Sequence, residues 1–210
     1  MEGFLALRRN MVDCQLRTYD VTDRAVLAAA DAVPREAFVP AGAAHLAYLD
    51  HPIALPGTGR ALMAPMVVAR MIQTLDVEPG EDVLEYAGGS GYGAALMAHI
   101  GAKAALWEPE EAARAFAADA LASAGVTVLD KPPAAGSFDA ILVGGACEIQ
   151  PASLFTLLRD EGRLVVVEGV GRAARVRLYQ KSGEVVSGRT VFDAYAPELP
   201  EFRRPAAFTF

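Results

Sequence analysis

A carboxylate, Glu85, and two glycines, Gly89 and Gly91, follow closely after the strand-like residues 82–84. Glycines lack a Cβ atom, so the turn that they form can adopt positive φ and bring backbone amides close to a ligand. A helix-like segment, 92–100, comes next. A strand, a glycine turn and a helix in this order are typical of the first unit of a nucleotide-binding α/β sheet. The pattern therefore predicts a small-ligand site at this turn.

The residues around the turn are compatible with two kinds of ligand. Gly89, Gly91 and Ala94 match the G-x-G-x-x-A spacing of dinucleotide sites, where a pyrophosphate rests on the helix N-terminus. Glu85 favours another ligand, because a carboxylate that faces the cleft repels a pyrophosphate and attracts a cation such as S-adenosylmethionine. Glu108, at the end of the next predicted strand, can accept hydrogen bonds from ribose hydroxyls. The two glutamates favour S-adenosylmethionine, and a nicotinamide cofactor or a ligand-free structural turn remain the alternatives.

The composition narrows the class of protein. The chain has 210 residues, 53% of them hydrophobic, and a net charge of -7, which suits one domain with an appendage. It has no basic block for nucleic acid or anionic lipid and no run of about 18 apolar residues for a membrane span. Cys14 and Cys147 are far apart and the histidines lack ligand spacing, so we expect neither a disulfide framework nor a metal site. The N-terminus lacks the apolar core of a secretion signal, so we expect a cytoplasmic protein.

Strand and helix patterns alternate around the glycine turn and predict an α/β fold. The predicted strands are 82–86, 103–107, 126–129, 138–143 and 163–167, and the predicted helices are 92–100, 109–124, 151–158 and one that begins at Pro65. This order predicts a Rossmann-like, mostly parallel sheet that is covered by helices. Segments 175–181 and 184–191 predict a C-terminal antiparallel hairpin through Ser182-Gly183.

The first 52 residues have a helical pattern instead. Helices are predicted at 9–18 and 23–33, with Thr22 as the N-cap of the second. We therefore divide the chain into three parts. They are a helical extension (1–52), a core (53–181) with a substrate-side loop at 53–65, and a C-terminal strand and tail (182–210) that complete the same domain.

Five segments resemble one known family. The run LPGTGRALMAPMVVARM at 55–71 looks like the signature that precedes the first strand of protein-L-isoaspartate O-methyltransferases. The segments VPREAFV at 33–39, AYLD at 47–50, VLEYAGGSGY at 83–92 and FDAILV at 138–143 fall in the order of that family. The glycine motif is shared by many methyltransferases, whereas the segments at 33–39 and 55–71 are far more specific. The resemblance covers about residues 10 to 170.

The resemblance implies an S-adenosylmethionine-dependent methyltransferase fold. Enzymes of this family transfer a methyl group from S-adenosylmethionine to the α-carboxylate of isoaspartyl residues in damaged proteins and release S-adenosylhomocysteine. The partner would be a protein or peptide, and the sequence gives no indication of the oligomeric state. The expected cofactor-binding residues are Glu85, Ala87, Gly88, Gly89, Ser90, Gly91 and Glu108.

The chain departs from the family at the acceptor side. Met63 occupies the position of the family's active-site serine, and Ala61 and Ala64 replace further polar residues. Residues 130–137 are also too short for the family's Gly-Asp-Gly turn, which contacts the cofactor. No catalytic residue is therefore assigned, and activity on isoaspartyl residues is expected to be weakened or lost. The alternative function is a non-catalytic descendant that binds a ligand or a protein partner.

Overall fold

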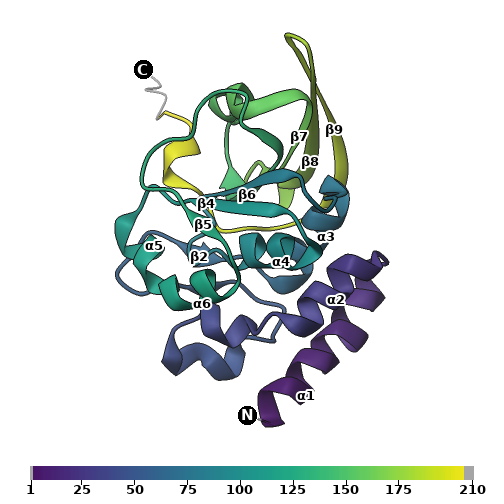
Figure 1. The fold of residues 1–210 in the computed structure, drawn as a ribbon, viewed down its shortest axis with the longest axis vertical. Coiled ribbons are helices and arrows are strands. Elements are labelled where there is room, and N and C mark those ends of the chain that lie inside the picture. Colours follow the sequence, from purple (N-terminus) through teal and green to yellow (C-terminus); the bar gives the residue numbers. More distant parts are fainter. Residues whose placement is uncertain (1, 206–210) are drawn as a thin grey trace.

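The computed structural model describes residues 2–205, which form an α/β fold around a seven-stranded sheet (Figure 1). The strand order is β5-β4-β3-β6-β7-β8-β9, and the pairs from β5 to β7 are parallel, whereas β8 and β9 add an antiparallel hairpin. The strands are β3 (Asp82–Tyr86), β4 (Lys103–Trp107), β5 (Thr127–Val128), β6 (Phe138–Cys147), β7 (Leu158–Glu168), β8 (Arg175–Ser182) and β9 (Val185–Asp193). The predicted fold class is confirmed.

The order of the strands places a ligand-binding edge at the glycine turn. β3 lies between β4 and β6, so the chain leaves β3 toward one edge of the sheet and later returns to the other side of it. In open α/β sheets, ligands bind beyond the carboxyl ends of the strands at such a switch point. The residues that follow β3, β4 and β6 therefore define the candidate site.

Helices cover one face of the sheet, and loops with short 3-10 turns cover the other. Val83 and Leu84 are both fully buried but belong to different clusters of the core, because successive side chains of a strand point to opposite faces. The first face is covered by α3 (Pro65–Leu75) and α4 (Tyr92–Ile100), with α1 (Glu2–Met11) and α2 (Arg24–Ala32) packed beyond them (Figure 1). The helical extension thus shares the main core.

Some predicted elements have different bounds or types. Asp23, not Thr22, is the N-cap of α2, because its carboxylate accepts hydrogen bonds from the amides of Ala25 and Val26. A π-helical turn (Val12–Leu16) follows α1. The predicted helix 109–124 is divided at Ala117 into α5 (Glu111–Phe116) and α6 (Ala118–Ser123), and no single residue explains the break. Segment 152–157 is a 3-10 helix rather than an α-helix.

Two loop segments lie over the carboxyl ends of the strands. One contains a short hairpin, β1 (Ile53–Ala54) and β2 (Ala61–Leu62). The other is residues 197–203, here called the C-terminal strap, which includes a 3-10 turn (Pro200–Phe202). The backbone of the strap makes two hydrogen bonds with Ala146 of β6. The Ala146 N–H donates to the Pro197 C=O at 2.7 Å, and the Leu199 N–H donates to the Ala146 C=O at 2.8 Å.

Among the helices of residues 2–205, none has the length and apolar character needed to cross a bilayer.

Candidate cofactor site

The glycine turn joins β3 to α4 through backbone that only small residues tolerate. Ala87, Gly89 and Gly91 all have positive φ, at 53°, 63° and 79°. A Cβ atom on Gly88 would lie 2.2 Å from the Cδ atom of Glu85, so this position has no room for a side chain. Ala87 has a Cβ atom, so its left-handed conformation costs about 1–2 kcal/mol. The turn is thus formed at some strain.

Glu85 lies beneath the turn instead of facing a cleft. Its side chain is 2% exposed, and its Oε2 atom accepts a hydrogen bond from the Ala94 N–H of α4 at 2.6 Å. Burial raises the pKa of the Glu85 carboxyl to about 8, although the amides of Ala94 and Gly93 oppose the rise. The carboxyl is therefore mostly protonated at pH 7. From the sequence we expected a negative charge that faces the cleft. The structure differs because the Glu85 side chain is directed toward the amides at the start of α4 and away from solvent.

Glu108 lies beside the turn, and hydrogen bonds to both of its oxygens connect it to three segments. Oε2 accepts from the Gly89 N–H at 2.9 Å, and Oε1 accepts from the Glu110 N–H at 2.9 Å and from the Arg60 Nε–H at 2.8 Å. The side chain is fully buried. Burial raises the pKa of the Glu108 carboxyl, and the Glu110 amide and the Arg60 guanidinium oppose that rise. The structure thus brings Gly89 and Glu108 together as the sequence predicts, and adds Arg60, for which no sequence pattern gave a signal.

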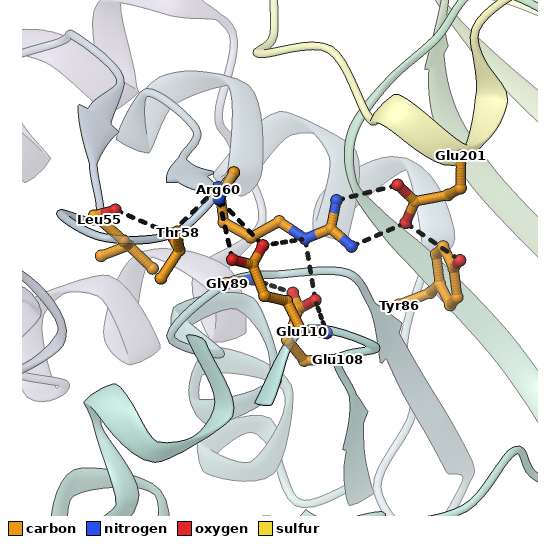
Figure 2. Close-up of polar contacts among 9 residues, drawn as sticks. Leu55, Thr58, Arg60, Tyr86, Gly89, Glu108, Glu110 and Glu201 are labelled. Carbon is orange, nitrogen blue, oxygen red and sulfur yellow. Dashed lines mark hydrogen bonds and ion pairs between the residues drawn. The ribbon is translucent and has the colours of Figure 1, made fainter. Parts of the chain in front are cut away.

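Arg60 forms the centre of a charged cluster, here called the Arg60 cluster, with Glu108, Glu110 and Glu201 (Figure 2). The two terminal nitrogens of Arg60 pair with the two carboxylate oxygens of Glu201 at 3.0 and 2.8 Å. Arg60 is only 5% exposed, whereas Glu201 is 29% exposed. Although burial acts to raise it, the pair with Arg60 holds the pKa of the Glu201 carboxyl below its usual value. The cluster therefore joins the β1–β2 loop, the end of β4 and the C-terminal strap.

The predicted cofactor-binding residues of the turn are covered in this arrangement. All five residues from Ala87 to Gly91 are buried. The Ser90 hydroxyl donates to the Phe38 carbonyl at 2.6 Å, and a Cβ on Gly89 would lie 3.0 Å from a methyl carbon of Leu55. An adenosyl group therefore does not fit against the turn unless the β1–β2 loop or Arg60 moves.

The acceptor-side residue Met63 is buried as well. Its side chain is 3% exposed and belongs to the main core. Its carbonyl accepts a hydrogen bond from Arg35 at 2.8 Å, and Arg35, itself fully buried, also donates to the Ala47 carbonyl and lies 4.7 Å from the ring centre of Tyr92. Arg35 thus fixes the backbone at Ala47 and Met63, a role that sequence reasoning missed.

Comparisons with known proteins identify the relatives of this chain. The family model of protein-L-isoaspartate(D-aspartate) O-methyltransferase matches residues 7–115. A protein-L-isoaspartate O-methyltransferase of Methylorubrum populi is 38% identical, with 88% of this chain and 90% of that protein covered. One of Methylorubrum extorquens is 41% identical over 77% of this chain and 74% of its own length.

Solved structures show the same fold. A protein-L-isoaspartate O-methyltransferase structure has a TM-score of 0.73 at 21% identity and covers 91% of this chain and 65% of that one. A Plasmodium falciparum structure, described as that enzyme with bound S-adenosyl-L-homocysteine, has a TM-score of 0.74 at 19% identity and covers 94% and 98%. The family match over residues 7–115 and the similarity to these curated relatives show that this chain belongs to the protein-L-isoaspartate O-methyltransferase family.

Proposed function

We propose that the chain is an S-adenosylmethionine-dependent methyltransferase that acts on the carboxylate of isoaspartyl residues in proteins or peptides, with weakened activity. The observation that carries the proposal is the hydrogen bond from Gly89 to Glu108. It places a carboxylate that can accept from ribose hydroxyls beside the glycine turn, at the switch point of the sheet. The curated relatives, which bear the name of this enzyme, support the same reaction.

The reaction makes modest demands on the protein. S-adenosylmethionine, when bound, supplies the methyl group. A free carboxylate has a pKa of about 4 and is already ionised at neutral pH, so the chain needs no strong general base. Its main task is to orient the acceptor. We assign Glu85, Ala87, Gly88, Gly89, Ser90, Gly91 and Glu108 to the cofactor site, which opens only when the groups that cover the turn move.

Met63 is the reason for expecting weak activity. A thioether cannot donate the hydrogen bond of the family's serine. The loss of one donor to a charged group costs about 1.5–3 kcal/mol, which slows transfer roughly ten- to a hundred-fold. The neighbouring Ala61 and Ala64 offer no replacement donor.

A second function is favoured by one specific observation. Glu108 is fully buried and both of its oxygens already accept hydrogen bonds from protein groups. A chain whose adenosyl site is permanently closed in this way would keep the fold for binding a protein partner. The two functions differ in a simple property, because only the methyltransferase binds S-adenosylhomocysteine.

The first test is the substitution Glu108→Ala. We expect wild-type protein to bind S-adenosylhomocysteine in calorimetric titration, and the variant to bind it about ten- to a hundred-fold more weakly, because a charged acceptor worth about 1.5–3 kcal/mol is lost. Glu111→Ala removes the same charge from an exposed position nearby and is the matched control. An unchanged affinity in Glu108→Ala would contradict the role of this residue, and an absence of binding by the wild type would favour the non-catalytic function.

The substitution Met63→Ser tests the acceptor side. We expect it to increase the rate of methylation of an isoaspartyl peptide, up to the ten- to a hundred-fold that one donor is worth. It also removes a buried apolar side chain, so the free energy of unfolding should fall by about 2–5 kcal/mol, and rates are compared at a temperature where both proteins are folded. Met66→Ser, at a half-buried position three residues away, is the control. An equal rate in all three proteins would argue against the missing hydroxyl as the cause of weak activity.

A further inference from the structure

The C-terminal strap reaches the candidate site from the side opposite to β4. Its residue Glu201 holds both terminal nitrogens of Arg60 and also accepts a hydrogen bond from the Tyr86 hydroxyl at 3.2 Å (Figure 2). Arg60 and Glu201 are 141 positions apart in the chain. Leu199 and Phe202 of the strap are buried, and Phe202 packs edge-on against Tyr86. The strap is thus fixed over the carboxyl ends of β3 and β6 by one ion pair, by two apolar side chains and by its backbone hydrogen bonds to Ala146.

We propose that Arg60 and the C-terminal strap form a latch on the cofactor site, and that an adenosyl ligand binds only after Arg60 has left Glu108. The inference rests on the proposed function, because it concerns the same site. It adds that Arg60 occupies Glu108, the carboxylate proposed to bind the ribose, and that the C-terminal strap keeps Arg60 in place.

Competition for Glu108 is the first argument for the latch. The Nε–H of Arg60 and the amide of Glu110 donate to Oε1 of Glu108, the amide of Gly89 donates to Oε2, and the side chain is fully buried among these groups. The two amides belong to the backbone around the site and cannot leave without unfolding it. Arg60 is carried by a side chain, so it is the one donor that a ribose hydroxyl can replace. Ligand binding and the Arg60–Glu108 contact therefore exclude each other.

The negative charges of the Arg60 cluster also support the latch. The cluster contains one guanidinium and the carboxylates of Glu108, Glu110 and Glu201. When Arg60 moves out, three carboxylates remain near one another and repel. A ligand that carries positive charge relieves this repulsion, as Arg60 does in the closed form. S-adenosylmethionine carries a sulfonium and an ammonium against one carboxylate, so its single net positive charge can take the place of the arginine.

The residues of the Arg60 cluster differ in burial, and this difference indicates which ion pair breaks first when the latch opens. Glu108 is fully buried and Arg60 is 5% exposed, whereas Glu201 is 29% exposed. Water therefore competes for the outer pair first, and the inner pair is released only afterwards. Removing the charge of Glu201 should loosen Arg60 while leaving the inner residues intact.

The test uses Glu201→Gln, which keeps the shape of the side chain and removes its charge. Glu198→Gln is the matched control, because Glu198 lies in the same strap but faces Arg203, at 3.5 Å. Trp107, the only tryptophan, packs edge-on against Tyr86 at 5.1 Å and reports on the strap without any ligand. We expect quenching of its fluorescence by acrylamide to increase in Glu201→Gln and to stay unchanged in Glu198→Gln.

Titration with S-adenosylhomocysteine tests the effect on the site. We expect Glu201→Gln to bind it at least about ten-fold more tightly than the wild type. The reason is that the variant loses the equivalent of about one charge-assisted hydrogen bond that holds Arg60 in place. Arg60→Lys is a second variant. It keeps the cation but loses the planar fork that pairs with both Glu201 oxygens, so its affinity should shift in the same direction.

Two results would overturn the latch, and they are distinct. Equal affinity in the wild type, Glu201→Gln and Arg60→Lys would show that Arg60 does not compete with the ligand, while the proposed methyltransferase function would stand. Failure of all three proteins to bind S-adenosylhomocysteine would overturn the proposed function, and the latch with it.

Discussion

The wild-type protein is expected to lose stability as the pH rises from 4.5 to 8, and the variant Glu85→Gln is expected to lose much less. Glu85 has a pKa of about 8 in the folded chain because it is buried, against 4.5 for a free carboxyl. Between these values the unfolded chain has released the proton and the folded chain has kept it. The unfolded state then binds fewer protons, so the free energy of unfolding falls as the pH rises, by roughly 3–5 kcal/mol across the window.

Glutamine is a suitable replacement because it resembles the protonated carboxyl. Its carbonyl oxygen can still accept the hydrogen bond that Glu85 receives from the Ala94 N–H. We therefore expect equal stability of the two proteins near pH 4.5 and a more stable variant at pH 8, measured by urea unfolding at several pH values. Glu184→Gln, in the exposed turn between β8 and β9, should keep the wild-type dependence on pH. The same slope in the wild type and Glu85→Gln would mean that Glu85 is ionised in the fold.

The protonation of Glu85 bears on how the site attracts a ligand. With a neutral Glu85 at pH 7, the negative charges at the ends of β3 and β4 belong to the Arg60 cluster. Attraction of a cationic cofactor then depends on Glu108, Glu110 and Glu201 and on whether Arg60 neutralises them. Glu85 supports the turn from below, so its effect on binding comes through the position of the backbone.

The elements around the turn could be predicted because their signals are local. The strands 82–86 and 103–107 and the helix 92–100 have the predicted bounds. The strand 103–107 is followed by the charged Glu108 and the helix 92–100 by Gly101, and Gly91 adopts the positive φ that its place before α4 requires. Where two residues were equally suitable, local signals did not decide, and Asp23 caps α2 although Thr22 precedes it.

The charged cluster could not be predicted because its contacts are long-range. Arg60 and Glu201 show no spacing that connects them, and only the course of the strap across β6 brings them together. The position of Glu85 at the end of a strand was correctly inferred, but not the direction of its side chain. That direction depends on the amides at the start of α4, one of which donates to the same carboxyl. Sequence patterns thus located the glycine turn, and packing determined how the turn is covered.

Gly144→Ala is expected to lower the free energy of unfolding by about 3 kcal/mol, the upper end of the usual range for overpacking. A Cβ atom at this position of β6 would lie 2.3 Å from the Cα atom of Gly88 and 2.6 Å from the carbonyl oxygen of Ala87. Both contacts are with backbone, which cannot rotate away as a side chain can. Gly42→Ala is the control, since a Cβ there meets nothing within 4 Å, and its effect should stay within about 0.5 kcal/mol.

The same substitution connects the stability of β6 to the ligand site. The turn can relieve the contact with the added methyl group only by moving away from β6, and Gly89 then moves with it and stretches its hydrogen bond to Glu108. We therefore expect Gly144→Ala to weaken binding of S-adenosylhomocysteine even under conditions where the variant is fully folded. Wild-type stability and affinity in this variant would show that the turn and β6 are not packed as closely as described. A loss of stability with unchanged affinity would show instead that β6 yields and the turn keeps its place, in which case the glycine at 144 serves the sheet and not the site.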